Sequence, residues 1–371
     1  MDIINCHIHT FTIDHVPDKF VGYGIDNLLR IKAIRGVVFF LLKNILPFSD
    51  RDLLDRYVRF MKIANKDNQE KVLKVVRGYY PESTKFVILP MDMEYADMGY
   101  VKNSLEEQHK ELAELCKKPK YQGKLFPFVA VDPRRDGILE MTKNLIENEG
   151  FKGIKIYPPL GYFPQDPRLD PVYEYAQEND LPVMTHCSRG GVYTKERDIK
   201  DKIKEHPDAP MNPGRFKNKD LTDYFTDPFN YKRVFEKFPD LKICLAHFGG
   251  DEEWEKYYDD PWDPDTGTEW DMSWLSKIRD MIKSEKYPNL YTDISYTILS
   301  MDDGMHILNI LMEDPVLAPK IMFGTDFYMI EREKMKERRL PMKLRSVIGE
   351  DKFRMIAETN PKRYLKNGIK I

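Results

Sequence analysis

Asp2-Ile3-Ile4-Asn5-Cys6-His7-Ile8-His9-Thr10 opens the chain, and its isoleucines favour an extended strand. Side chains alternate between the two faces of a strand, so His7 and His9 are predicted to project from the same side. Two imidazoles that point at one spot suit a divalent metal bound through neutral ring nitrogens, provided that other ligands approach from elsewhere in the fold. A His-x-His pair also occurs in strands as surface or structural residues. The pair alone therefore leaves metal binding open.

The rest of the chain repeats short apolar strand patterns that are nearly all followed by helical patterns. Strands are predicted, after the first one, at 86–91, 125–131, 153–157, 181–186, 241–247, 290–294 and 321–323. Helices are predicted at 104–116, 138–148, 171–179, 229–238, near 274–286 and 304–312, and from about 330. Such alternation calls for a parallel sheet, and eight units close a barrel. The predicted fold class is therefore α/β, a (β/α)8 TIM barrel. A doubly wound open sheet is the alternative, but no Gly-rich phosphate turn follows any strand.

Long insertions interrupt this repeat. Residues 12–84 form a far longer segment than an ordinary connection between a strand and a helix. Its parts at 25–46 and 50–76 carry apolar residues at helical spacing, which predicts a helical insertion after the first strand. The apolar run at 36–42 is predicted to pack against the body of the protein, and a contact between subunits of a homo-oligomer is the alternative. Further insertions are expected at about 188–227 and 250–272 within a single domain that spans 1–371.

Composition excludes several classes of partner. The formal charge is −3, from 58 Lys+Arg and 61 Asp+Glu, which gives no electrostatic reason to expect nucleic acid or an anionic membrane. The N-terminus lacks a signal-peptide pattern, and the longest apolar run is too short to cross a bilayer. The four cysteines are scattered without a C-x-x-C pair, as expected for reduced thiols in a cytoplasmic protein: Cys6, Cys116, Cys187 and Cys244.

Chemistry-bearing residues gather at the ends of the predicted strands. Catalytic groups of these barrels sit at the C-terminal ends of the strands, where the loops converge. Those positions hold His7, His9, Lys155, His186, His247 and Asp326. Each has a structural reading of its own: a single buried histidine is often only part of the core, and Asp326 could cap the next helix. Together they make a ligand set for zinc or a similar divalent ion with one position left open for water.

Several motifs resemble those of the amidohydrolase superfamily, in particular amidohydrolase family 2, the branch related to aminocarboxymuconate semialdehyde decarboxylase. The matching segments are 7–9, 153–157, 182–186, 245–250, 321–326 and 358–365. The resemblance implies a barrel with one catalytic divalent metal, usually zinc, with manganese or another ion as alternatives. It implies that His7, His9, His186 and Asp326 are ligands and that His247 stands beside the metal-bound water as an acid–base group. Some branches carboxylate a lysine at the position of Lys155 to bridge two metals, which stays open here.

These roles predict a metal-dependent hydrolase that cleaves a C–O or C–N bond of a small carboxylate-bearing amide, ester or lactone. A metal lowers the pKa of bound water from near 16 to roughly 7, so that hydroxide forms at neutral pH. Asp326 could accept the proton of that water, and His247 could hydrogen-bond the developing oxyanion. Lys155 and Arg189 are candidates to grip the substrate carboxylate, with Tyr157 as a third substrate-binding candidate.

Two other functions remain open. The same groups perform non-oxidative decarboxylation in the branch that the motifs resemble, with protonation of the substrate carbon. A non-catalytic barrel that binds metal structurally is the third hypothesis, although structural zinc sites usually close their coordination shell, often with thiolates. Metal content and a substrate panel would separate the three.

Overall fold

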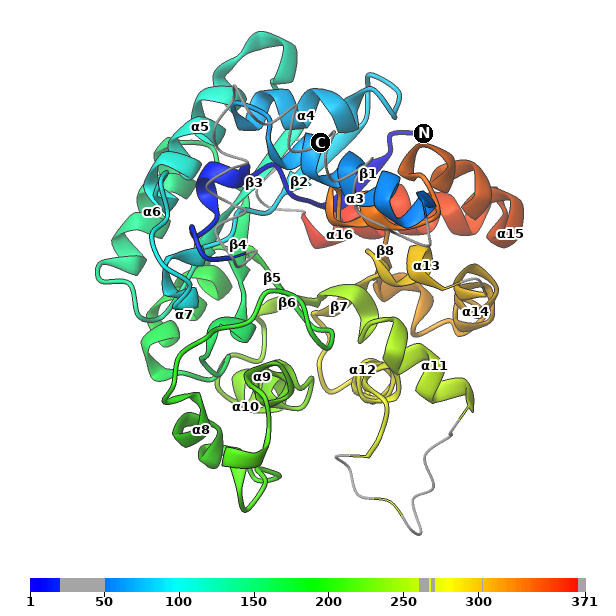
Figure 1. The fold of residues 1–371 in the computed structure, drawn as a ribbon. Coiled ribbons are helices and arrows are strands. Elements are labelled where there is room, and N and C mark those ends of the chain that lie inside the picture. Colours follow the sequence, from blue (N-terminus) through cyan, green and yellow to red (C-terminus); the bar gives the residue numbers. More distant parts are fainter. Residues whose placement is uncertain (21–50, 260–266, 268–270, 302, 366–371) are drawn as a thin grey trace.

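The computed structural model describes residues 1–20, 51–259, 267, 271–301 and 303–365. Eight strands follow one another around a single parallel sheet in the order of the chain, as Figure 1 shows. They are β1 (Ile4–Ile8), β2 (Lys85–Ile88), β3 (Leu125–Val131), β4 (Gly153–Ile156), β5 (Pro182–Thr185), β6 (Lys242–Leu245), β7 (Leu290–Asp293) and β8 (Ile321–Met322). The chain just after β8 returns to β1: Cys6 N donates to Phe323 O at 2.9 Å, and Ile8 forms a parallel bridge with Phe327. The predicted TIM barrel is confirmed.

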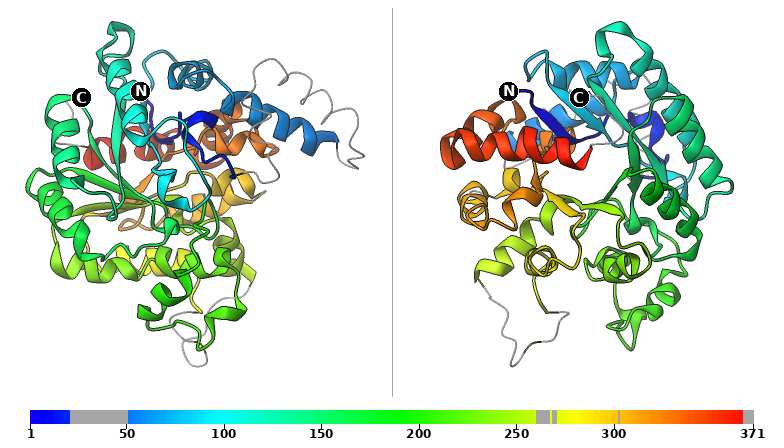
Figure 2. Two further views of the ribbon diagram at one scale, coloured as in Figure 1. Left: turned by 60° about the vertical axis from the view of Figure 1, so that its left-hand side comes forward. Right: turned by 180° about the vertical axis from the view of Figure 1, so that it is seen from behind.

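Helices surround this barrel in both views of Figure 2. The helices predicted between the strands form at α5 (Leu105–Lys117), α6 (Ile138–Asn148), α7 (Asp170–Glu178), α10 (Asn230–Lys237), α12 (Trp274–Lys283) and α14 (Gly304–Leu311), followed by α15 (Leu340–Arg354) and α16 (Asn360–Tyr364). Two of the insertions also carry helices, namely α8 (Ile199–Lys202) and α9 (Asn218–Thr226), then α11 (Asp251–Asp259). A further short helix, α13 (Thr297–Ser300), follows β7.

The insertion after β1 is helical where the structure describes it. Its helices are α3 (Arg51–Ala64) and α4 (Gln69–Arg77), separated where the Asn68 side chain accepts a hydrogen bond from Lys71 N and caps α4. The predicted helix at 25–46 and the apolar run at 36–42 lie outside the described residues. The expected single domain and the oligomeric contact through this insertion stay predictions.

The prediction that a helix starts at about residue 330 was wrong. Residues Met329–Arg332 and Glu337–Arg339 form short 3-10 turns, and α15 begins only at Leu340, with Pro341 in its first turn, where a proline fits. Backbone carbonyls of this segment accept hydrogen bonds from α3 instead: Arg56 Nη1 donates to Arg332 O at 2.9 Å and Arg59 Nη2 to Glu331 O at 2.6 Å. The insertion therefore holds the loop that follows β8.

Two layers of apolar side chains make the core. The inner layer fills the barrel and includes Ile4, Cys6, Val87, Leu89, Phe126, Phe128, Met184, Cys244, Tyr291 and Met322. The outer layer lies between strands and helices and takes the alternate strand positions, such as Ile154 and Ile156 of β4. All four cysteines are free. Within the described residues, no helix combines the length and the apolar character that a membrane crossing requires.

Candidate metal centre

A break in the alternation of β1 turns its histidines into the barrel. Ile4 and Cys6 belong to the inner layer, but Ile8 belongs to the outer one, so the alternation changes between Cys6 and Ile8. The pairing of β1 with β2 shifts register over the same residues, as at a β-bulge, and His7 N donates to the Asn5 side chain at 3.2 Å. His7 and His9 consequently share the inner side of the barrel end.

In both His7 and His9 the ring nitrogen Nδ1 faces a hydrogen-bond acceptor. His7 Nδ1 lies 3.0 Å from Asp293 Oδ2, and His9 Nδ1 lies 2.7 Å from the carbonyl oxygen of Leu89. A carboxylate and a carbonyl can only accept, so both Nδ1 atoms carry the hydrogen. In the neutral imidazole each Nε2 then presents a lone pair. Both Nε2 atoms face Asp326 Oδ1, at 3.5 Å from His7 and 3.0 Å from His9.

These three ligand atoms fit a divalent cation. The Nε2 atom of His7 is buried and has no hydrogen-bond partner, and burial lowers the pKa of His7 to about 3, so the ring is neutral at pH 7. Burial alone would raise the pKa of Asp326, but the nearby histidines hold it well below its usual value. Two lone pairs and an anionic oxygen thus face one another. Tetrahedral ligands at about 2.0–2.1 Å from zinc lie roughly 3.3 Å apart, which matches this spacing.

Asp326 owes its position to β1 rather than to β8 alone. Its backbone is in the left-handed region, at φ 60°, and its amide donates to His7 O at 2.9 Å. The preceding Thr325 hydroxyl donates to Glu337 Oε1 at 2.9 Å and accepts from Asn5 Nδ2 at 2.9 Å. Buried hydrogen bonds therefore link Thr325, the residue before Asp326, to Asn5 of β1 and to Glu337 of the segment before α15.

The Glu337 carboxyl in that network should make stability depend on pH. Burial raises the pKa of Glu337 from 4.5 to about 8. Below pH 4.5 the group is protonated in folded and unfolded chains alike. Between pH 4.5 and about 8 only the unfolded chain releases the proton, so stability falls as the pH rises through this window, by on the order of 4 kcal/mol in total.

Glu337→Gln removes this titration while keeping an acceptor oxygen for Thr325 and for Tyr80, whose hydroxyl donates to Glu337 Oε1 at 2.8 Å. We expect the free energy of unfolding of the variant, relative to the wild type, to increase between pH 5 and pH 8. Chemical denaturation of both proteins at the two pH values measures it. Parallel pH profiles would contradict the prediction.

His247 and His186 form a hydrogen-bonded pair next to the three ligand atoms. His247 follows β6, and its Nδ1 lies 3.0 Å from the Ser295 carbonyl, which leaves Nε2 as the acceptor. His186 Nδ1 donates to that atom at 3.0 Å, and His186 Nε2 lies 3.2 Å from Ser188 Oγ. Burial lowers the pKa of both histidines. The structure thus brings His7, His9 and Asp326 together and places His186 against His247; its predicted role as a fourth ligand stays a prediction.

Lys155, the penultimate residue of β4, carries an ammonium group without a hydrogen-bond partner. The side chain is 2% exposed, and Nζ has no hydrogen-bond partner. Burial lowers its pKa to about 8, and attraction by Asp293 and Asp326 limits the shift. Tyr157, two residues on, lies with its ring 4.7 Å from that of His186, and its hydroxyl accepts from Val192 N at 3.0 Å. Both candidates therefore adjoin the histidines.

Arg189 is engaged elsewhere. Its guanidinium forms ion pairs with Glu253 and, at 3.2 Å, with Asp223, and it lies 4.8 Å from the ring of Trp274. A substrate carboxylate would have to compete with both of these carboxylates for Arg189, and the predicted role of Arg189 in substrate binding stays a prediction.

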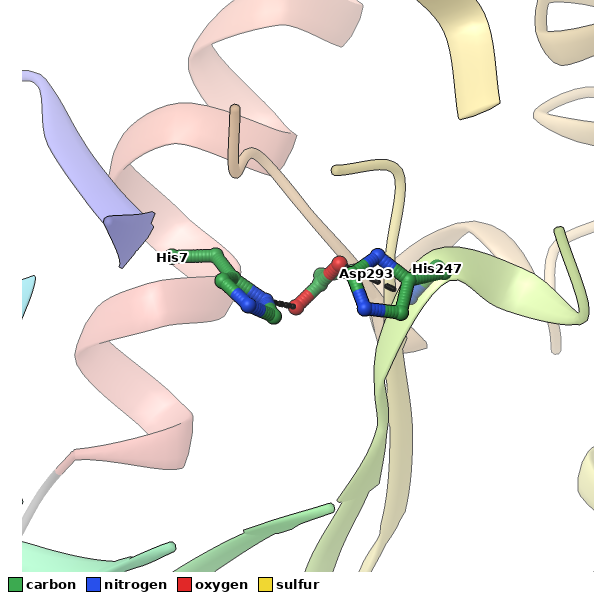
Figure 3. A group of neighbouring side chains, drawn as sticks. All are labelled: His7, His247 and Asp293. Carbon is green, nitrogen blue, oxygen red and sulfur yellow. Dashed lines mark hydrogen bonds and ion pairs between the residues drawn. The ribbon is translucent and has the colours of Figure 1, made fainter. Parts of the chain in front are cut away.

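Two residues of this region, Asp293 and Ser295, were missed by the sequence reasoning. Asp293 lies between His7 and His247 in Figure 3, and Ser295 Oγ is 3.0 Å from His7 Nδ1 and 2.9 Å from His247 Nδ1. The rule that found the other candidates could have found Asp293, because it is the last residue of β7. A serine just after a strand carries no such signal.

Comparisons with known proteins identify the family of this chain and proteins of similar fold. A family model described as Amidohydrolase matches residues 4–366. No curated protein matches the chain. One similar solved structure is 5-carboxyvanillate decarboxylase from Novosphingobium aromaticivorans with manganese and 4-hydroxy-3-methoxy-5-nitrobenzoic acid, at 13% sequence identity and a TM-score of 0.58, covering 98% of this chain and 96% of the other. A second is 2,6-dihydroxybenzoate decarboxylase from Rhizobium, at 15% identity and a TM-score of 0.53, covering 99% of each chain. A third is 4-oxalomesaconate hydratase from Rhodopseudomonas palustris, at 14% identity and a TM-score of 0.50, covering 98% of this chain and 96% of the other. At such identities the likeness concerns the fold.

Proposed function

The chain belongs to the amidohydrolase family, and from this premise we propose that it is a metal-dependent enzyme that removes carbon dioxide from a small aromatic carboxylic acid without oxidation. The two decarboxylases that share the fold support this reaction over the hydrolysis that the sequence alone favoured. His7, His9 and Asp326 would hold the divalent ion, with His186 as the proposed fourth ligand. The manganese in one of these structures makes that ion a candidate beside zinc.

The observation that carries the proposal is the unpaired ammonium of Lys155. Burial keeps the rings of His7, His186 and His247 neutral at pH 7. Asp293 and Asp326 each contribute −1, and Lys155 contributes +1, because its pKa is about 8. With a divalent ion bound, these charges sum to +1. A single substrate carboxylate would neutralise the site, and it would give the Lys155 ammonium a partner.

The residues of the chain divide the reaction between them. When bound, the ion supplies Lewis acidity that draws electrons from the substrate oxygens. Lys155 binds and orients the carboxylate that is to leave. When the bond between the ring carbon and the carboxylate carbon breaks, its electron pair stays on the ring carbon, which takes up one proton. We assign that proton transfer to His247. Ser295 O holds the hydrogen on its Nδ1, and its Nε2, an acceptor that faces His186, would take up one proton from solvent and pass it to the ring carbon.

Release of carbon dioxide tests the proposal. The protein is loaded with zinc or manganese and assayed with 5-carboxyvanillate and 2,6-dihydroxybenzoate, alongside a panel of lactones, esters and amides. We expect metal-dependent release of carbon dioxide that a chelator abolishes. Hydrolysis without decarboxylation would restore the reaction first expected, and bound metal without any turnover would favour the non-catalytic barrel.

Lys155→Met should weaken binding of the substrate carboxylate. A hydrogen bond to a charged group contributes about 1.5–3 kcal/mol, so we expect kcat/KM to fall by about tenfold to a hundredfold, mainly through KM. Lys242→Met is the matched control, because Lys242 is also buried, pairs with Asp180 at 2.9 Å and lies at the opposite end of its strand. Equal losses in the two variants would speak against substrate binding by Lys155.

A further inference from the structure

One buried carboxylate joins the two histidines with different proposed roles. Asp293 is fully buried and lies between His7 and His247, as Figure 3 shows. Its Oδ2 accepts from His7 Nδ1 at 3.0 Å. Its Oδ1 accepts from the backbone amides of His247 and Ser295, at 3.0 Å each, and from the Ser295 hydroxyl.

We infer that Asp293 is a positioning residue with two contacts. One oxygen fixes His7 in the tautomer that can bind a metal, and the other fixes the backbone conformation of His247. The inference rests on the proposed metal centre. It concerns the imidazole of His7 and the backbone of His247, which Asp293 contacts, and assigns to Asp293 itself no contact with the ion or the substrate.

The occupancy of the carboxylate supports a holding role. His7, His247 and Asp293 are close enough to form a second candidate metal group. Oδ1 already accepts three hydrogen bonds, and Oδ2 faces the hydrogen on His7 Nδ1, so neither oxygen needs a cation. Each oxygen thus acts as a hydrogen-bond acceptor for a neighbouring group.

The bond to His247 secures a backbone that is otherwise unfavourable. His247 has φ 67°, in the left-handed region that non-glycine residues rarely adopt. Asp293 holds its amide, and the Thr297 hydroxyl donates to its carbonyl at 2.6 Å. The surrounding residues therefore over-determine this conformation, as strained residues at functional sites require.

Asp293→Asn would keep the shape of the side chain and replace one acceptor oxygen by a donor NH2 group. Three donors face the Oδ1 site, so the amide oxygen should occupy it and the amide NH2 should face His7 Nδ1. An N–H donor then faces Nδ1 in place of the carboxylate, which favours the ring proton on Nε2, where it blocks metal binding. The variant should keep its fold but bind metal about tenfold to a hundredfold more weakly.

Metal affinity, measured by competition with a chelator, is compared among the wild type, Asp293→Asn and Asp132→Asn. Asp132 is the matched control, because it is buried and its carboxylate pairs with Arg134 at 2.6 Å and accepts the Arg134 amide, rather than bonding a histidine. Loss of affinity in Asp293→Asn alone supports the inference. Unchanged affinity in both overturns it, whereas a wild type that binds no metal overturns the proposed function instead.

Nitrogen NMR of the metal-free wild type keeps the inference testable even if the variant does not fold. Histidine-labelled protein reports which ring nitrogen carries the hydrogen, and a His7→Gln sample assigns the signal. We expect Nδ1–H with a bare Nε2 at His7. A hydrogen on Nε2 would overturn the inference without bearing on the reaction catalysed.

Discussion

Asp326→Asn is expected to abolish metal binding and turnover together. Within the part of the chain that the structure describes, Asp326 Oδ1 is the one anionic atom that faces both Nε2 atoms of the His-x-His pair. Losing an outer-shell partner of a metal already costs about 10–100-fold in affinity, so losing an anionic ligand should cost at least about a hundredfold in affinity and more in kcat. Inductively coupled plasma mass spectrometry and carbon dioxide release measure the two effects.

Stability supplies the control for Asp326→Asn. The neighbouring histidines stabilise the Asp326 anion in the folded chain, so the metal-free variant should be somewhat less stable than the metal-free wild type at pH 7. Added zinc or manganese should raise the melting temperature of the wild type but not that of the variant, because only a bound ion shifts the folding equilibrium. A variant that still gains stability when metal is added would exclude Asp326 as a ligand.

His247→Asn is expected to retain metal and lose on the order of a hundredfold in kcat, since removal of a positioned catalytic donor has costs of this size. His186→Ala should instead lose metal, if His186 is the fourth ligand. Metal content and kcat are measured for both variants with the same substrate. Equal loss of metal in both would show that the role of His247 is misassigned.

The two histidines share a hydrogen bond, so this comparison also needs a chemical control. His186 Nδ1 donates to His247 Nε2, and its removal frees that acceptor. We expect imidazole added in solution to restore part of the activity of the His247 variant if the ring acts in proton transfer. The same addition should not restore a variant that has lost its metal.

The strand and helix pattern was largely predictable, because it depends on neighbours close in the chain. The bounds of β3 and α6 agree with prediction residue for residue, since uninterrupted apolar character and helical spacing are local properties. The late start of α15 was not predictable in this way. Hydrogen bonds from Arg56 and Arg59, more than 270 positions away, hold the preceding carbonyls.

The sequence predicted which residues belong to the candidate site better than it predicted the contacts that they make. Strand ends identified His7, His9 and Asp326, which the fold brings together, and the same rule applied to β7 would have added Asp293. The ion pairs of Arg189 were not predictable, because Asp223 and Glu253 come from different helices of the insertions.

By itself the sequence determined that eight strand and helix units close a barrel and that histidines and an aspartate stand at its strand ends, because periodicity and spacing are written in consecutive residues. Only the tertiary structure decided which way those side chains point. Strict alternation would have turned His7 and His9 away from Ile4 and Cys6 and toward the helices. The register shift against β2 and the hydrogen bonds from the chain after β8 reverse that direction, and such pairing depends on residues far away in the sequence.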